Sequence, residues 1–247
     1  MPHPIHIGIG GWTFEPWRGT FFPKGLPQTK ELHFAARALT AIEVNGTYYR
    51  TQTPSTFRKW AGEAPEGFVF AVKAPRCATA RRVLSDGGES VKAFLNSGLE
   101  ELGPHLGPIN WQLPPTKAFD VDDLAGFLDF LPTWLNGLPL RHAVEARHAS
   151  FHDPRFAELL RARGIPAVQA EDSDYPRLET PTAPFAYLRI MGTREDEPLG
   201  YAPSELDTWA DRVRRMAKDR EVFLFVISGH KAHNPVAAQA LLERLQA

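Results

Sequence analysis

The sequence has one cysteine, almost no net charge and no long hydrophobic run, and each shortage argues against a class of protein. A single cysteine cannot form an internal disulfide, so we expect a protein of the cytoplasm rather than a disulfide-stabilised secreted one. The 28 Lys and Arg nearly balance the 29 Asp and Glu, which gives a formal net charge of −1. This balance removes the general electrostatic argument for binding nucleic acid or a membrane surface. No apolar run reaches the roughly 18 residues of a membrane span.

The chain does contain the composition of a globular protein. Of its 247 residues, 43% are hydrophobic and 23% are charged, whereas a disordered chain would have fewer apolar residues and more net charge. A chain of about 250 residues is long enough for one α/β barrel. No shift of composition marks a linker, so we predict a single domain over residues 1–247.

Short apolar segments rich in β-branched and aromatic residues recur along the chain, and helical patterns separate them. Parallel strands need such crossovers, and eight units of this kind fit a closed TIM-type (β/α)8 barrel. No Gly-x-Gly-x-x-Gly turn leads from a strand into a helix, which argues against an open dinucleotide-binding sheet. We expect an irregular crossover between the sixth and seventh strands, because residues 173–184 hold three prolines and little periodicity. The predicted strands are 5–11, 41–47, 68–74, 108–113, 141–147, 167–172, 185–192 and 222–228.

Several expected helices have a recognisable first turn. Thr53, Asp153 and Asn234 each precede a proline, which is the pattern of a capping side chain before the first helical residue. Ser204 opens a segment with the pattern of a capping box.

Alternation along the strands predicts which side chains face the barrel interior. The apolar set faces the helices, which leaves polar side chains inward and late in their strands. Barrel enzymes have their sites at this carboxyl end, and burial of an unpaired charge costs several kcal/mol. We therefore expect a functional site there, with an ion-pair network that merely closes the barrel as the alternative for any one residue. The six charged residues are Glu43, Lys73, Glu145, Arg147, Asp172 and Arg189.

The residue types predict acid–base chemistry on a small anionic molecule, phosphorylated or carboxylated. The candidate proton-transferring residues are Glu145, Glu43, Asp172 and Lys73. The first strand is followed by a long aromatic loop, 12–23, which we interpret as a binding loop or lid with about half of its aromatic residues packed as a satellite core. The candidate ligand-binding residues are Arg147, Arg189, Asn45, Tyr48, Gln112, His148, Trp12 and Arg76.

The chain also resembles a known family over essentially its full length, the YecE-like family, or domain of unknown function 72. The segments that carry the resemblance begin with Ile7-Gly8-Ile9-Gly10-Gly11-Trp12 and Glu43-Val44-Asn45-Gly46-Thr47-Tyr48-Tyr49-Arg50. They continue through Phe68–Pro75, Gln112–Pro115, Glu145–His148, Asp172-Ser173 and Tyr187-Leu188-Arg189. The resemblance implies a TIM-type barrel and no particular reaction.

One segment departs from the family pattern. Many members end the last strand with an aromatic residue, two asparagines and an aspartate, whereas this chain has Phe225-Val226-Ile227-Ser228-Gly229-His230-Lys231. We expect His230 and His233 to be surface residues that do not replace the amides. We also expect Cys77 to be a small buried side chain and not a nucleophile, because no histidine at a strand end is an obvious partner.

Three further hypotheses remain open. Lys73 could form a Schiff base if its pKa is depressed, although a nearby Glu43 or Glu145 would keep it protonated. A metal-dependent phosphodiesterase or isomerase could use Glu43, Glu145, Asp172 and His148, but metal-binding histidine motifs are missing and three inward cations would repel a metal ion. We predict no cofactor, and a divalent metal is disfavoured. A non-catalytic protein that binds nucleic acid or another ligand is the last alternative, and the neutral charge does not favour nucleic acid.

Overall fold

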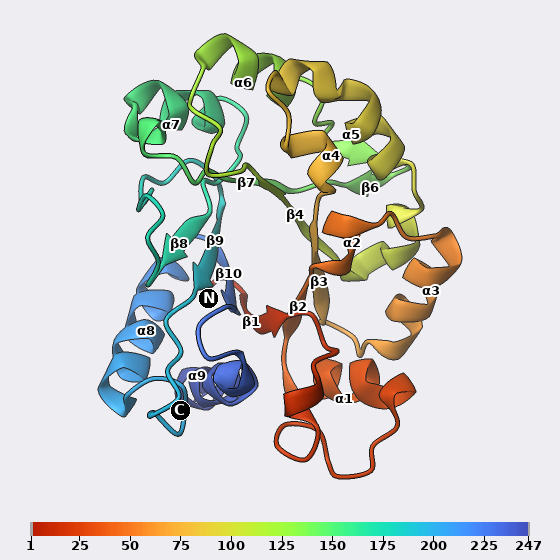
Figure 1. Ribbon diagram of the computed structural model, residues 1–247, viewed down its shortest axis with the longest axis vertical. Helices are drawn as coiled ribbons and strands as arrows, with labels where there is room; N and C mark the ends of the chain where they lie inside the picture. Colours follow the sequence, from red (N-terminus) through yellow and green to blue (C-terminus); the bar gives the residue numbers. More distant parts are fainter. Residues whose placement is uncertain (1, 247) are drawn as a thin grey trace.

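A computed structural model describes residues 2–246 and has eight parallel strands in one curved sheet, with helices on its outside (Figure 1). The strand order is β7-β4-β3-β2-β1-β10-β9-β8. The two terminal strands approach each other at a parallel bridge between Val144 and Ala167, where Val144 N donates to Pro166 O and Val168 N donates to Val144 O. The sheet is therefore a barrel that closes through one bridge, as the strand–helix alternation predicted.

The eight predicted strands are confirmed, with shorter bounds for most of them. They are β1 Ile5–Gly10, β2 Ala41–Val44, β3 Val69–Lys73, β4 Leu106–Gln112, β7 His142–Glu145, β8 Gln169–Glu171, β9 Phe185–Ile190 and β10 Glu221–Val226. The α-helices are α1 Glu31–Ala38, α2 Gly46–Tyr49, α3 Pro54–Glu63, α4 Arg76–Thr79, α5 Gly88–Leu95, α6 Val121–Leu128, α7 Pro154–Arg161, α8 Pro203–Met216 and α9 Asn234–Gln246. Short 3-10 helices are Glu15–Trp17, Gln28–Lys30, Leu84–Gly87, Leu99–His105, Ala149–His152 and Lys231–His233.

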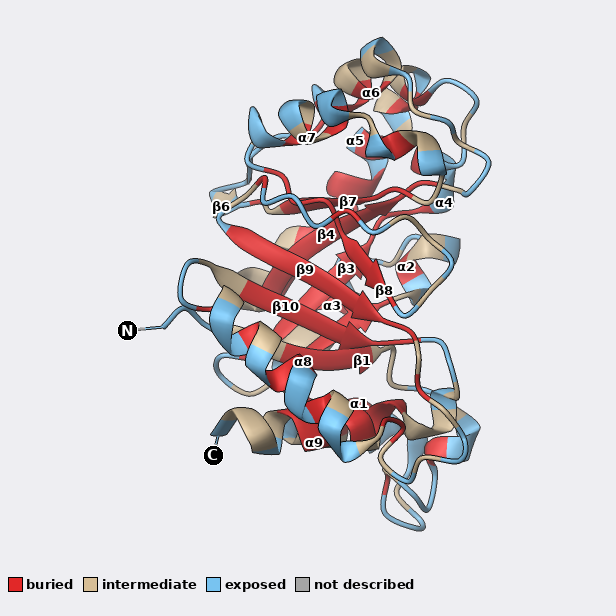
Figure 2. Cartoon of the chain, turned by 90° about the vertical axis from the view of Figure 1, so that its left-hand side faces the viewer, coloured by how far each residue is buried: buried red, intermediate tan, exposed pale blue. Residues whose placement is uncertain are grey.

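The two faces of the sheet pack into two separate hydrophobic clusters, as period-two alternation requires. The outer cluster joins the strands to the helices and includes Ile42, Trp111 and Leu188. The inner cluster fills the barrel with small residues and a few aromatic ones, such as Ala71 and Phe225. Figure 2 shows the strands buried along most of their length, while helix α8 has a buried and an exposed side.

The predicted division between inward and outward residues is confirmed for β2, β3, β4, β7 and β9. It is wrong for β10, where Leu224 and Val226 were predicted to face inward with Ser228 but pack in the outer cluster, because Ser228 lies beyond the strand end at a positive φ of 60°.

The helix starts were predicted correctly in two of four cases. The side chains of Thr53 and Asp153 accept hydrogen bonds from the backbone N–H groups of Thr56 and Arg155, so both are N-caps. Asn234 is instead the first residue of α9, and its side-chain oxygen accepts a hydrogen bond from Thr193 Oγ1. Helix α8 starts at Pro203, one residue before the predicted cap Ser204, because the Glu205 carboxylate accepts from the N–H of Ala202.

The irregular crossover is confirmed, and it explains an unusual strand. The described chain has no helix between β8 and β9, so no apolar helix face covers the outside of β8. The outward residues of this strand are Gln169 and Glu171, which are both buried. Arg212 of α8 donates to both of them, at 2.9 Å and 2.6 Å, and Arg177 of the crossover lies 3.0 Å from Glu171. Two arginines thus replace the missing helix.

A small antiparallel hairpin, β5 Trp134–Leu135 and β6 Leu138–Pro139, was not predicted. Its turn is Asn136-Gly137, with φ angles of 49° and 85° at the two residues. Asn-Gly favours this tight hairpin turn because both residues tolerate positive φ. Among the described residues, no helix has both the length and the apolar content that crossing a lipid bilayer requires.

His142 at the start of β7 makes stability depend on acid pH. Burial lowers its pKa from 6.5 to about 4, and the neutral ring accepts a hydrogen bond from Trp111 Nε1 and donates one to Pro132 O. Between pH 6.5 and 4 the unfolded chain binds more protons, so this contribution to stability is present above pH 6.5 and is lost as the pH falls towards 4. The full loss is about 3 kcal/mol.

Urea unfolding between pH 7 and 4 measures this effect. The decrease in the free energy of unfolding should be smaller in His142→Gln than in the wild type. The exposed His152 provides the control, and His152→Gln should follow the wild-type curve. A wild-type curve that parallels that of His142→Gln over this range would contradict the assignment.

Candidate functional site

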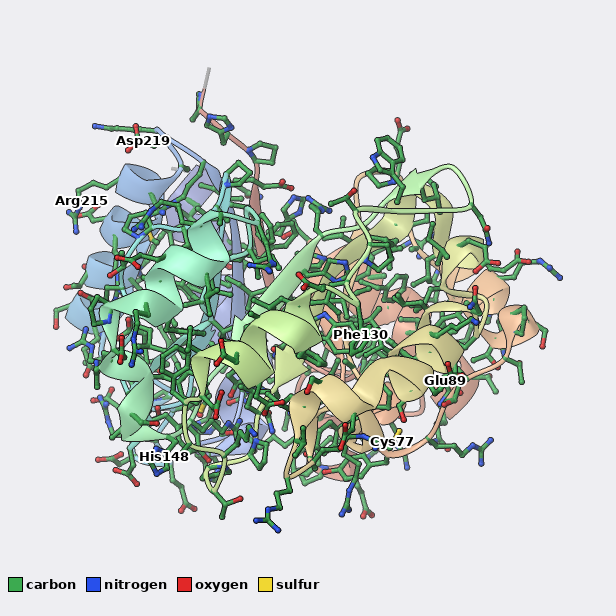
Figure 3. All side chains as sticks on the ribbon, turned by 90° about the horizontal axis from the view of Figure 1, so that it is seen from above. Cys77, Glu89, Phe130, His148, Arg215 and Asp219 are labelled. Atoms are coloured by element: carbon green, nitrogen blue, oxygen red, sulfur yellow. The ribbon has the colours of Figure 1, made fainter. Side chains whose placement is uncertain are left out.

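The predicted site residues lie at the carboxyl ends of neighbouring strands. Glu43, Lys73, Gln112 and Glu145 come from β2, β3, β4 and β7, each within one residue of its strand's end, and Arg189 comes from the penultimate position of β9. Figure 3 shows the same end from the side: Cys77 and His148, which follow β3 and β7, lie at one edge of the molecule, while Asp219, which precedes β10, lies at the opposite edge.

Arg189 is the centre of an ion-pair network across this end of the barrel. Its Nη2 lies 3.0 Å from Glu43 Oε1, and its Nη1 lies 2.6 Å from Glu145 Oε2. The second oxygen of Glu43 accepts a hydrogen bond of 2.6 Å from the Tyr187 hydroxyl. Asn110 Nδ2 donates to Glu145 at 3.1 Å. Both carboxylates are completely buried, so each has its charge compensated by partners within the protein.

Arg147 extends the network to the barrel rim. Its guanidinium contacts Glu145 Oε1 at 2.6 Å and donates to Gln112 Oε1 at 2.8 Å. It also donates to the Tyr175 hydroxyl at 3.0 Å and lies 4.2 Å from the centroid of the same ring. Tyr175 belongs to the irregular crossover, so this segment is fixed against the site. We call Glu43, Glu145, Arg147 and Arg189 the mouth network.

The charges of the mouth network stabilise one another. Burial alone would raise the pKa of Glu145, but Arg189 and Arg147 hold it below its ordinary value. Burial likewise opposes the charge of Arg189, and the two carboxylates nevertheless raise its pKa. Burial and the charge of Glu43 raise the pKa of Tyr187 well above its usual range, so the hydroxyl remains protonated and donates. For these four residues the geometry fits the alternative of a network that closes the barrel.

Lys73 lies beside the mouth network without joining it. Its side chain is buried, and within residues 2–246 no carboxylate lies within ion-pair distance of its ammonium group. The Nζ atom lies instead 4.3 Å from the centroid of the Tyr48 ring. Burial lowers the pKa of Lys73 to about 8, and repulsion by Arg189 adds to this, against the attraction of Glu43 and Glu145. With two carboxylates and three cations, the group carries one excess positive charge when Lys73 is protonated.

Asp172 does not belong to this group, so its predicted place in the cluster is wrong. The strand β8 ends at Glu171, and Asp172 follows it with a positive φ of 53°, so the alternation of the strand does not extend to this residue. Its carboxylate accepts a hydrogen bond of 3.1 Å from the Tyr201 hydroxyl. Burial raises the pKa of Asp172, and the charges of Glu171 and Glu205 raise it further. It lines a separate cavity of about 460 Å³ beside α8.

The other predicted ligand-binding residues have different positions. Tyr48 contacts Lys73, and Gln112 accepts a hydrogen bond from Arg147. Trp12 and Asn45 line a cavity of about 300 Å³ next to the mouth network. His148 accepts a hydrogen bond from the N–H of Ser150 and caps the following 3-10 helix. Arg76 is exposed at the start of α4.

Cys77 is exposed, so the prediction of a buried thiol is wrong. It lies in the one-turn helix α4, whose buried residues are Ala78 and Thr79, and its own side chain therefore faces solvent. His230 and His233 are half-buried rather than surface residues. Their ring centroids lie 4.6 Å apart, and His233 Nδ1 donates to the backbone oxygen of Arg194.

About half of the aromatic side chains of the loop after β1 are buried, as predicted, but they join the outer cluster and do not form a separate satellite core. Trp17 and Phe22 are almost completely buried, and Trp17 Nε1 donates to the backbone oxygen of Lys231 at 2.9 Å. Trp12 and Phe14 remain partly exposed, so the loop keeps apolar surface at the rim. Within residues 2–246, no three His, Cys, Asp or Glu side chains lie close enough together to hold a metal ion.

Comparison with known proteins agrees with this architecture. A family model described as a protein of unknown function, DUF72, matches residues 6–247. The chain belongs to the DUF72 family. The YecE-like resemblance seen in the sequence is thereby confirmed. The UPF0759 protein YunF of Bacillus subtilis is 24% identical over 159 residues, which are 62% of this chain and 54% of YunF. The chain thus spans about half the length of this curated relative.

Two crystal structures of DUF72 family proteins have the same fold. TM1631 of Thermotoga maritima has a TM-score of 0.81 and 24% identity, and the match covers 99% of this chain and all of that one. EF0366 of Enterococcus faecalis has a TM-score of 0.73 and 18% identity, with coverage of 99% and 98%. This likeness shows that the TIM-barrel-like fold extends over the whole chain.

Three residues of this DUF72 site were not predicted from the sequence. Tyr187 and Asn110 complete the shell of the carboxylates, and Tyr175 covers Arg147. Tyr187 and Asn110 have the inward parity of Arg189 and Gln112, so strand alternation could have identified them. Tyr175 lies in an irregular segment, where no periodic pattern predicts what a side chain contacts.

Removal of Arg189 should strongly destabilise this DUF72 protein. In Arg189→Met, two buried carboxylates lose their shared partner, which costs about 3–5 kcal/mol of the free energy of unfolding. Addition of Glu43→Gln and Glu145→Gln should recover part of the loss, because the unpaired charges are then gone. Urea unfolding measures both effects. The matched control is Arg58→Met, which removes an exposed arginine paired with Glu101 and should change stability little. A loss no larger than that of the control would contradict the role of the network.

Lys73 should reduce stability at neutral pH. Its pKa is about 8 in the folded protein against 10.5 ordinarily, so the unfolded chain binds more protons between these values. The cost of burying the charge is full below pH 8 and disappears as the pH rises to 10.5. We expect Lys73→Met to be more stable than the wild type by about 3 kcal/mol at pH 7, with the difference shrinking towards pH 10.5. Urea unfolding of both proteins from pH 7 to 10.5 tests this, and a difference independent of pH would refute it.

Proposed function

We propose that this DUF72 protein is an enzyme that binds a small anionic molecule, phosphorylated or carboxylated, at the carboxyl end of the barrel. Lys73 then acts as the acid or base that exchanges a proton with this substrate. The observation that carries the proposal is the lone position of Lys73. A network that only closes the barrel is already balanced by two arginines and two glutamates. Lys73 adds a buried cation that makes the fold less stable, and an apolar side chain would cost less. A ligand anion supplies the missing partner.

The geometry changes the roles that we assign to the charged residues. Both oxygens of Glu43 and of Glu145 are occupied by hydrogen-bond donors, and arginines hold the pKa of Glu145 low. These carboxylates therefore orient the arginines and are poorly suited to exchange protons near pH 7. A group with a pKa of about 8 is close to the operating pH, which is the condition for efficient acid–base catalysis.

Inorganic phosphate is the simplest probe of this site. We expect phosphate to bind the wild type and to bind Lys73→Met at least about tenfold more weakly, because the uncompensated cation is gone. Wild-type affinity should fall as the pH rises through 8, when the ammonium loses its proton. Titration calorimetry from pH 7 to 9.5 measures both effects.

Lys59→Met provides the control, since Lys59 is an exposed lysine on α3. It should bind phosphate like the wild type. Equal phosphate binding by Lys73→Met and the wild type, or a wild-type affinity for phosphate that does not change with pH, would contradict the proposal.

One observation favours a second candidate, Schiff-base chemistry at Lys73. The expectation that Glu43 or Glu145 would keep the amine protonated weakens, because both carboxylates are engaged by arginines and the pKa of Lys73 is low. The neutral amine would add to a carbonyl carbon, and loss of water would give an imine. Borohydride reduction in the presence of small keto acids should then add a stable mass to Lys73, and none to Lys73→Met.

A further inference from the structure

A cavity of about 300 Å³ lies between the ends of β1 and β2, directly beside the mouth network. Gly10 of β1 is the register partner of Glu43, and Val44, Asn45 and Gly46 continue the chain from Glu43 into the cavity wall. A ligand in this cavity therefore reaches the same end of the barrel as Lys73. We call it the tryptophan cavity, because Trp12 and Trp60 both line it.

Two indole rings form part of the wall of the tryptophan cavity. The rings of Trp12 and Trp60 lie 5.1 Å apart at an angle of 81°, so each ring holds the other in place by an edge-to-face contact. Gly11 and Gly46 also line the cavity, and a Cβ built on either would meet nothing within 4 Å. The indole rings and the bare backbone give one part of the cavity wall a rigid surface, on which a planar ring can stack.

Two amide side chains give this space hydrogen-bonding capacity. Asn45 and Gln52 line the cavity, and each uses its amide nitrogen for a bond to a nearby backbone oxygen. Within residues 2–246, no hydrogen bond uses Oδ1 of Asn45 or Oε1 of Gln52. Gly10 leaves room for the Asn45 amide, since a Cβ at Gly10 would lie only 2.9 Å from Asn45 Nδ2. Amides present a donor and an acceptor in one plane, which is how Asn and Gln recognise the edges of nucleobases.

An unpaired cation lies at the rim of the same cavity. The Nζ atom of Lys231 is 4.3 Å from the centroid of the Phe14 ring and 5.5 Å from that of Trp17. No carboxylate of residues 2–246 lies within ion-pair distance of it. Trp17 holds the backbone of Lys231 by a hydrogen bond, so the aromatic loop fixes this lysine in place. The cavity thus combines indole rings, two amides with free oxygens and a positive charge.

We propose that the tryptophan cavity binds the base of a small nucleotide, with its phosphate between Lys231 and Lys73. This inference rests on the proposed function and narrows its ligand to a planar heterocycle joined to an anionic group. Stacking on an indole face favours the base, and the two lysines favour the phosphate. A volume of about 300 Å³ is at the small end of the range for ligand pockets, which favours a mononucleotide over a larger ligand.

Four probes separate the parts of the ligand: inorganic phosphate, ribose 5-phosphate, adenosine and adenosine monophosphate. We expect the monophosphate to bind at least about tenfold more tightly than ribose 5-phosphate, because the base stacks. Adenosine and the monophosphate should quench tryptophan fluorescence, whereas phosphate and ribose 5-phosphate should not. Titration calorimetry and fluorescence measure these effects on the full chain.

Variants assign the effects to residues. Trp12→Leu and Gln52→Ala should each lose most of the advantage of the monophosphate over ribose 5-phosphate and keep phosphate binding. Gln52→Ala leaves the core untouched, so it remains informative if Trp12→Leu does not fold. Lys231→Met should weaken the monophosphate and leave adenosine unchanged. The matched control is Trp134→Leu, an exposed tryptophan of the β5–β6 hairpin, which should behave like the wild type.

Two outcomes would overturn the inference. One is equal affinity for the monophosphate and ribose 5-phosphate without quenching by adenosine, which means that no base binds. The other is tight binding of glucose 6-phosphate that depends on Trp12, which assigns the cavity to a saturated sugar ring. In both cases, phosphate binding that is strong in the wild type and weak in Lys73→Met still supports the proposed function. If neither the wild type nor Lys73→Met binds phosphate, the proposed function itself is contradicted.

Discussion

Burial of the Arg189 guanidinium is the constraint on which the carboxyl end of the barrel depends. A charge removed from water must have partners of opposite charge, and Glu43 of β2 and Glu145 of β7 supply them. Those carboxylates have further oxygens to satisfy, so Tyr187, Asn110 and Arg147 follow. Arg147 in turn needs Gln112 and the hydroxyl of Tyr175. One cation thus accounts for side chains from four strands and for the position of an irregular crossover.

The network also determines where chemistry can occur. It closes the barrel with groups whose charges are mutually compensated and whose oxygens are occupied, so these residues have little capacity for a ligand or a proton. What remains available lies to one side, towards β1, β2 and β3: the ammonium of Lys73 over Tyr48, and a cavity with two indoles and two amides. The fold therefore separates a rigid, neutral plug from an open, positively charged margin. This separation is the physical basis for placing the site at Lys73 rather than at the carboxylates.

Strand alternation carried most of the prediction from sequence, and its failures have a common cause. Alternation placed Glu43, Lys73, Glu145 and Arg189 inward, because a residue's side of a strand depends only on its position within the strand. It failed for Asp172, where the chain leaves the strand one residue earlier and adopts a positive φ. It offered nothing for Cys77, which lies in a single helical turn whose buried residues are its neighbours. Both errors lie just beyond a strand end, where the period-two rule stops.

The sequence by itself determined the number of strands, the barrel, the inward charges other than Asp172 and the irregular crossover, because each depends on local periodicity or on proline content. Only the tertiary structure decided which charges pair. Tyr187 and Glu43 are 144 positions apart, and their contact depends on how eight strands are arranged around a cylinder. The same arrangement left Lys73 without a carboxylate, because Arg189 and Arg147 occupy the glutamates first. The order of charged residues in the sequence does not predict which of them pair, because pairing depends on the distances between their side chains in the folded protein.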